Sequence, residues 1–262
     1  MLKLLLIEWL KIRRYRTFWI LAGLFAILLF FWNWFIGTGI ISMGNGNFNV
    51  LNSAYTFPAV WPTIGHWTKV FSGLIAIIVI ILSTNEYQFR TNRQNVIDGW
   101  QRLQFFHAKW LVVVSLSVAV TLYTFIMGIF FSLHNGSQLA GAATGLIKLL
   151  HVFIMTINYF GFALTLSFLL KRSGITIIIF LLYGYIIEIM LQQLLNWKFS
   201  YKPGNYLPLQ CSAELLGLQI LNSLKAMMPG TGPTENMLML VSVGWVAVYY
   251  ILGRWLLLRS DI

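Results

Sequence analysis

Charge is scarce in this sequence of 262 residues. Charged residues make up 10% of the chain, hydrophobic residues make up 58%, and the mean hydropathy is +0.76. Because a soluble globular domain is about one-quarter charged, this composition excludes an ordinary soluble domain and predicts a chain that mostly faces lipid. The single cysteine, Cys211, excludes an intramolecular disulfide, and no Cys/His spacing resembles a zinc site.

The motifs of common nucleotide-binding and hydrolytic sites are also missing. The chain contains no G-x-x-x-x-G-K-[ST] phosphate-binding loop, no H-E-x-x-H zinc motif and no G-x-S-x-G nucleophile motif. The sequence therefore predicts that this chain is not an enzyme and holds no cofactor or metal. If ATP drives it, ATP and magnesium bind to a separate subunit.

Long apolar runs dominate what is present. A helix needs about 20 apolar residues to cross a bilayer, and six runs reach this length. Alternation over segments of about ten residues, which marks a membrane β-barrel, does not occur. The sequence predicts an all-α integral membrane protein, a single transmembrane domain over residues 1–262, with six spans at residues 18–37, 63–84, 111–133, 146–170, 174–197 and 237–257.

Basic residues give the net charge of +11, and they alternate between the two sides of the predicted spans. Thirteen of the 18 lie before span one, between spans two and three, between spans four and five, or at the C-terminal end of the chain from Arg254 on. Since positively charged loops stay in the cytoplasm, both termini are predicted to be cytoplasmic. The basic surplus is thus a topology signal and an attraction to anionic membrane lipid, and it does not indicate a nucleic-acid partner.

Three polar segments flank the spans. Residues 1–16 fit a helix lying in the headgroup region, or else an extension of span one. Residues 198–236 are predicted to be external, with short helices between spans five and six. Residues 85–110 form the densest polar stretch, hereafter the polar island. It fits either a cytoplasmic surface helix that binds a soluble partner or a solvated loop.

Two groups of polar residues fall inside predicted spans. Glu188 lies in span five with Gln192 one turn further on, and an intramembrane carboxylate is a functional candidate by default. It either lines a translocation route or a dimer seam, or is a protonated packing group bonded to Gln192 or to the external segment. Asn158 and Tyr159 in span four form the second group, for which close helix packing is favoured over contact with a substrate.

The polar island carries a resemblance at residue level. Glu86-Tyr87, Thr91, Arg93, Arg102 and Ala108-Lys109 follow one another in this order into span three, and NYLPLQ (205–210) opens the external segment. Within a six-span frame, this resembles the transmembrane (permease) subunit of type-2 ATP-binding-cassette (ABC) exporters. That family usually has a glycine before the threonine, where this chain has Arg90.

The resemblance implies a function and partners. It implies the membrane-spanning half of an ATP-driven exporter in the bacterial cytoplasmic (inner) membrane, paired with a second permease copy or a similar permease. A nucleotide-binding ATPase subunit would dock on a coupling helix in the polar island, at Glu86, Arg90, Arg93, Asn95, Asp98 and Arg102. The alternatives are a non-transporting membrane anchor or assembly subunit, and an integral-membrane enzyme that uses Glu188.

Overall fold

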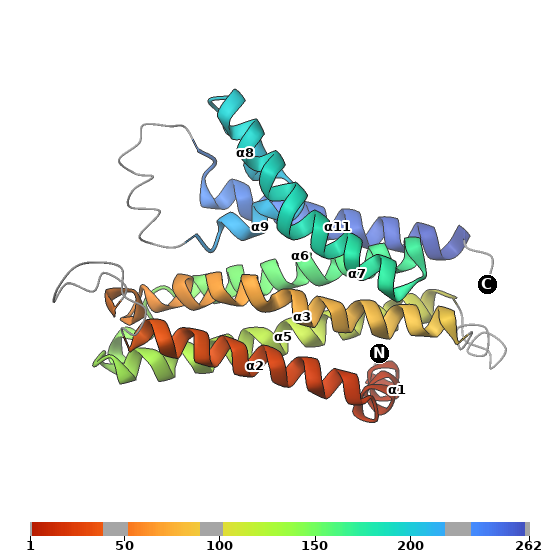
Figure 1. Ribbon diagram of the computed structural model, residues 1–262, viewed down its shortest axis with the longest axis horizontal. Helices are drawn as coiled ribbons and strands as arrows, with labels where there is room; N and C mark the ends of the chain where they lie inside the picture. Colours follow the sequence, from red (N-terminus) through yellow and green to blue (C-terminus); the bar gives the residue numbers. More distant parts are fainter. Residues whose placement is uncertain (1, 39–51, 90–101, 218–231, 260–262) are drawn as a thin grey trace.

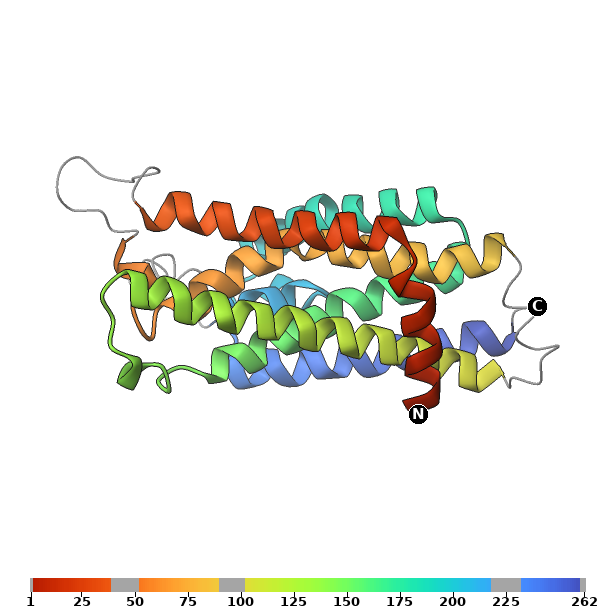
Figure 2. The same cartoon turned by 90° about the horizontal axis from the view of Figure 1, so that it is seen from below.

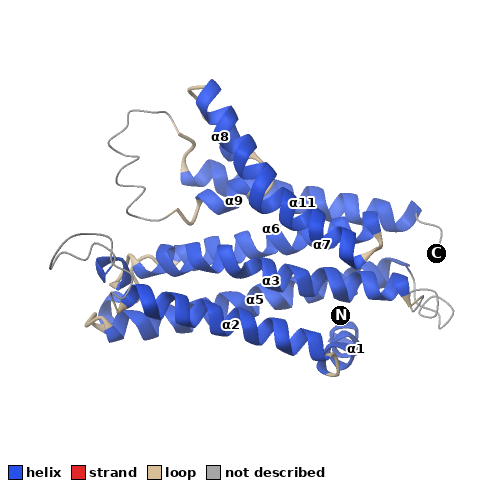
Figure 3. Cartoon of the chain, in the orientation of Figure 1, coloured by secondary structure: helices blue, strands red, loops and turns tan. Residues whose placement is uncertain are grey.

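The computed structural model describes residues 2–38, 52–89, 102–217 and 232–259. Within these ranges the chain is helical, with turns and short loops between the helices and no strand (Figure 3). The sequence-based expectation of an all-helical protein is therefore confirmed for the part of the chain that the structure describes.

Six helices are long and apolar enough to cross a membrane. Each has 22 to 33 residues, or roughly 33 to 50 Å at 1.5 Å per residue, which exceeds the roughly 30 Å of bilayer hydrocarbon. Large apolar side chains point outward on these helices, for example Ile20, Ile126 and Leu240. The six helices are α2 (Arg16–Gly37), α3 (Val60–Gln88), α5 (Arg102–His134), α6 (Ile147–Leu170), the continuous helix Ser173–Lys198, and α11 (Glu235–Arg259).

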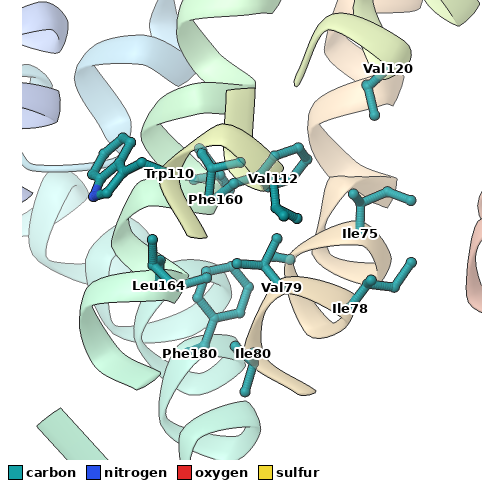
Figure 4. Close-up of a cluster of buried hydrophobic side chains, with 14 of the residues drawn as sticks. Ile75, Ile78, Val79, Ile80, Trp110, Val112, Val120, Phe160, Leu164 and Phe180 are labelled. Carbon is teal, nitrogen blue, oxygen red and sulfur yellow. The ribbon is translucent and has the colours of Figure 1, made fainter. Parts of the chain in front are cut away.

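Helix α6 lies at the centre of the bundle and packs against α3, α5 and α11. In its most apolar window 67% of the residues are buried, compared with 22% in Ser173–Lys198 and in α11. Side chains from three helices meet around it: Val79 of α3, Val112 of α5, and Phe160 and Leu164 of α6 belong to one buried cluster (Figure 4). Because α6 is surrounded by other helices, its position determines which polar side chains of the bundle are shielded from the surroundings.

Helix α1 (Leu2–Arg13) is separate from α2 and lies across the end of the bundle (Figure 2). The helix breaks at Arg14 and Tyr15, where Tyr15 has an extended backbone (φ −90°, ψ 105°). The N-terminal segment is thus a helix of its own and not an extension of span one. It contacts α5 and α2.

The fifth long helix changes its geometry midway. It consists of α7 (Ser173–Leu182), a π-helical stretch η3 (Tyr183–Ile187) and α8 (Glu188–Lys198). A π-helical turn inserts an extra residue into the helix and often marks a functional position. After this stretch α8 diverges from the bundle that α7 joins (Figure 1).

Among the described residues between α8 and α11, two short helices are present. They are η4 (Pro203–Tyr206) and α9 (Gln210–Glu214). Other short 3₁₀ helices are η1 (Asn52–Tyr55) and η2 (Leu139–Gly141). Of the predicted external segment 198–236, residues 218–231 lie outside the described residues.

The polar island is described only at its two ends. Residues 85–88 continue α3, and residues 102–110 form the start of α5. The middle of the island, residues 90–101, lies outside the described residues, and with it the predicted coupling helix. Two long helices therefore lead into and out of the island, at the end of the bundle where α1 lies (Figure 1).

Candidate functional site: buried charges at two levels of the bundle

Four charged side chains from three helices meet beside the polar island. Lys109 of α5 donates to Glu8 Oε2 of α1 at 2.7 Å and to Glu86 Oε1 of α3 at 2.6 Å. Lys11 of α1 donates to Glu8 Oε1 at 3.1 Å and to Glu86 Oε1 at 3.0 Å. These four residues, hereafter the charge cluster, carry two positive and two negative charges.

The charge cluster is largely removed from solvent. Glu8 is 2% exposed, Lys109 3% and Glu86 7%, whereas the side chain of Lys11 reaches the surface. Burial alone would raise the pKa of Glu8, but the charges and hydrogen bonds of Lys109 and Lys11 outweigh it, and the pKa is lowered. Burial would lower the pKa of Lys11, but Glu86 and Glu8 outweigh it, and that pKa is raised. Both residues of α1 are therefore held in their charged forms.

Of the charge cluster, Glu86 was predicted from the sequence as a docking residue and Lys109 was noted only in the family resemblance, whereas Glu8 and Lys11 were not singled out. A signal was present: Glu8 is the only acidic residue before Glu86, and it shares a helical face with Leu5 and Ile12. A carboxylate on the apolar face of an amphipathic helix needs a buried cation. The sequence could not show which of 18 basic residues supplies it.

The other predicted docking residues divide between described and undescribed positions. Arg102 Nη1 donates to the carbonyl oxygen of Leu258 near the end of α11, at 3.3 Å. This contact ties the start of α5 to the last turn of the final span. The remaining predicted docking residues lie outside the described residues: Arg90, Arg93, Asn95 and Asp98.

Glu188 lies deep in the bundle and is 0% exposed. Its Oε1 accepts hydrogen bonds from the backbone N–H groups of Leu209, at 2.6 Å, and Gln210, at 3.2 Å. These groups lie at the start of α9, where backbone N–H groups lack partners within the helix. Of the two alternatives for this residue, the geometry matches packing against the segment between spans five and six.

Gln192 and Asn158 contact the same segment from two other directions. Gln192 Nε2 donates to Asn205 Oδ1 at 3.0 Å and to Glu214 Oε1 at 2.8 Å. Asn158 Nδ2 of α6 donates to the carbonyl oxygen of Pro208 at 2.8 Å and to Ser212 Oγ at 3.0 Å. Three of the four predicted intramembrane residues thus hold η4 and α9 in place.

The fourth residue, Tyr159, is 2% exposed and belongs to the main apolar cluster. It follows Asn158 directly, so the two side chains leave α6 in different directions. The ring of Tyr159 is therefore a core element of the bundle.

The family model described as ABC-2 family transporter protein matches residues 4–187. This range contains the whole charge cluster, the first four candidate spans and part of the fifth. The chain belongs to the ABC-2 transporter family. Comparison with curated proteins gives no significant match.

Membership of the ABC-2 family defines the broad role of the chain. It is a multi-pass membrane protein and a membrane component of an ABC-2 type transporter, confirming the resemblance noted in the sequence. Members of this family are typically non-catalytic membrane subunits, and no cofactor is indicated for this chain. Among the described residues, no group of three or more His, Cys, Asp or Glu side chains is placed to hold a metal ion.

Proposed function

We propose that this ABC-2 membrane protein is the membrane-spanning subunit of an ATP-driven exporter. Two copies, or one copy and a similar subunit, form the translocation route, and a separate ATPase binds the nucleotide and magnesium. The charge cluster is the observation that carries the proposal. It joins α1 to the two helices that enter and leave the polar island.

The proposed ATPase-docking residues are Glu86, Arg90, Arg93, Asn95, Asp98 and Arg102. A docking surface can move spans only if it is rigidly connected to them. The charge cluster supplies such a connection, because Lys109 is bonded to both α1 and α3. At the other edge of the island, Arg102 is bonded to α11. Displacement of the island by a partner would therefore reach four helices.

We place the chain in the bacterial cytoplasmic membrane with both termini in the cytoplasm. In support, α1, the end of α3, the start of α5 and the end of α11 lie at one end of the bundle (Figures 1 and 2). The turn between α6 and α7 lies there too, since Gln88 donates to Ser173 at 3.3 Å. This end carries most of the basic residues, as the positive-inside rule requires of a cytoplasmic face.

Charge reversal in the polar island tests the proposal. We expect an Arg90→Glu/Arg93→Glu double variant to lose co-purification with its ATPase, while remaining folded in the membrane. Lys198→Glu, an exposed lysine at the opposite end of the bundle, is the matched control and should retain the ATPase. A double variant that binds as well as the wild type would contradict docking at the island.

A transport assay separates export from anchoring. Vesicles containing the chain and its ATPase should release or accumulate cargo when ATP is supplied. ATPase association without any ATP-dependent movement of cargo would indicate a non-transporting anchor or assembly subunit. A third expectation from sequence, an enzyme using Glu188, has no support in the geometry, because one carboxylate oxygen is bonded to α9 and the side chain is 0% exposed.

A further inference from the structure

A cavity of about 420 Å³ lies between α1, α2 and α5. This volume falls in the range of small-molecule sites, about 300–1,000 Å³. The cavity lies beside the charge cluster, and neither the fold nor the proposed coupling role accounts for it. Its walls include Leu5, Trp9, Phe18, Ala22, Val112 and Ala119.

The walls offer hydrocarbon and almost no hydrogen bonding. Two polar residues line the cavity, Glu8 and Ser115, and both are already bonded elsewhere. Both carboxylate oxygens of Glu8 accept from lysines of the charge cluster, and the hydroxyl of Ser115 donates to the carbonyl of Val112 at 2.9 Å. A polar ligand would lose its own hydration without compensation in such a site. An alkyl chain would not incur this loss.

The cavity opens at the surface of the protein. Trp9 and Trp19 line it and are 46% and 52% exposed. Along α5 it extends from Val112 to Ala119, or about 10 Å at 1.5 Å per residue. This length accommodates part of an acyl chain, and the rest of the molecule must lie outside.

The turn that joins two walls of the cavity is strongly basic. Arg13, Arg14 and Arg16 are all exposed there, between the last turn of α1 and the first turn of α2. The indole of Trp19 donates to the carbonyl of Arg13 at 3.1 Å, which fixes the turn against the cavity wall. Basic residues near a membrane surface attract anionic lipid. The molecule outside the cavity should therefore carry negative charge.

We propose that this cavity binds an anionic glycerophospholipid, with one acyl chain between α1, α2 and α5 and the phosphate beside the three arginines. The bound lipid would fill the space between α1, α2 and α5, beside the charge cluster, whose Glu8 lines the cavity. The proposal does not depend on the identity of the cargo. Its failure would leave ATPase docking at the polar island untouched.

Lipid retention measures the proposed site directly. The purified chain is equilibrated in nanodiscs of phosphatidylglycerol and phosphatidylcholine in equal amounts, and bound lipid is counted by native mass spectrometry. We expect the wild type to retain phosphatidylglycerol in preference to phosphatidylcholine. Ala119→Trp, which places an indole in the cavity, should reduce retention by more than tenfold, since each expelled methylene weakens binding by a factor of about four.

Two further variants separate the cavity and the arginines from general effects. Val118→Trp places the same indole on the neighbouring exposed position of α5, outside the cavity wall, and should retain lipid normally. Arg13→Gln/Arg14→Gln should keep a bound lipid but lose the preference for phosphatidylglycerol, whereas Arg254→Gln, an exposed arginine of α11, should keep that preference.

Three results would overturn the lipid site. The first is equal retention of both lipids by the wild type, which would indicate a general hydrocarbon groove. The second is equal loss in Ala119→Trp and Val118→Trp, which would indicate a general effect of the indole. The third is an unchanged preference for phosphatidylglycerol in Arg13→Gln/Arg14→Gln. Both arginines are exposed, so this variant should fold whether or not the cavity binds lipid.

Discussion

The ammonium group of Lys109 lies 2.7 Å from the carboxylate of Glu8, although 101 residues separate them in the chain. Both side chains are 3% exposed at this ion pair. An N-terminal helix with little buried surface of its own is thereby fixed to the third span. The contact explains how so short a helix keeps a defined position across the end of the bundle.

Removal of Lys109 should destabilise the protein strongly. Lys109→Met leaves Glu8 and Glu86 buried with Lys11 as their remaining partner in the charge cluster, and breaking a buried pair costs about 3–5 kcal/mol. The measurement is thermal unfolding in detergent. Lys148→Met breaks the Lys148–Glu235 pair, in which Glu235 is 62% exposed, and should cost less than about 1 kcal/mol. Equal shifts in the two variants would contradict the structural role of the charge cluster.

Docking of α1 should depend on pH. The pKa of Glu8 in the folded protein is below its ordinary value of 4.5, because the lysines outweigh the effect of burial. Its stabilising contribution is therefore complete above pH 4.5 and is lost as the pH falls through the lowered value. The pKa of Lys11 is raised, so its stabilising contribution is complete below pH 10.5. That contribution is lost as the pH rises through the raised pKa. The hydrogen-exchange protection factors of α1, which correct for the intrinsic pH dependence of exchange, should accordingly fall at the acidic and alkaline extremes and stay high between them.

A Glu8→Gln variant provides the control for the acidic limb. It removes the titrating group, so the protection factors of α1 should be lower at neutral pH and should change less on acidification. An acidic limb of the same size in the variant and the wild type would assign the pH dependence to another group.

Glu188 should stabilise the α9 segment. Glu188→Ala leaves the N–H groups of Leu209 and Gln210 without their acceptor. An unsatisfied buried group of this kind costs about 1–3 kcal/mol of stability. Glu188→Gln keeps an acceptor oxygen and should be milder. The measurement is hydrogen-exchange protection of residues 203–214, compared with Met190→Ala on the exposed side of α8. Transport assayed on the same folded variants tests the translocation role, and unchanged transport in Glu188→Ala would eliminate that role.

Gly204 should tolerate no larger residue. A Cβ atom there would lie 2.5 Å from the carbonyl oxygen of Gln192 and 2.7 Å from its Cα, both backbone atoms of α8. We expect Gly204→Ala to push η4 away from α8, which should destabilise the folded protein by about 1–3 kcal/mol. Gly244→Ala in α11 meets nothing within 4 Å and should be neutral or stabilising. Thermal unfolding of both variants measures the contrast, and equal melting temperatures would argue against the close approach of η4 to α8.

The number of spans and their approximate limits could be read from the sequence. The predicted run 146–170 and α6 (Ile147–Leu170) differ by one residue, and the other five differ by no more than a few, apart from α5. In lipid every backbone group must be bonded within the segment, so a long apolar run has essentially one conformation. Helix α5 begins at Arg102, nine residues before the predicted run, because a helix can continue into the headgroup region with polar residues.

Partners of the buried charges were decided by the tertiary structure alone. The sequence marked Glu86 as a docking residue of the polar island, and it left two alternative roles open for Glu188. The structure bonds Glu86 to Lys11 and Lys109, and Glu188 to the backbone of α9. These contacts depend on how each helix is rotated about its axis, and several rotations present equally apolar faces to lipid.

The sequence by itself determined that this chain is a helical membrane protein, how many times it can cross, and which family it resembles. Those properties follow from local composition, because each span satisfies its own backbone whatever its neighbours are. Only the tertiary structure decided that α6 is central, that α1 lies across the bundle, and that a lysine of α5 joins α1 to α3. Those properties follow from side chains that lie far apart in the chain, 101 residues for Lys109 and Glu8 and 23 for Lys109 and Glu86, and no local pattern records such a meeting.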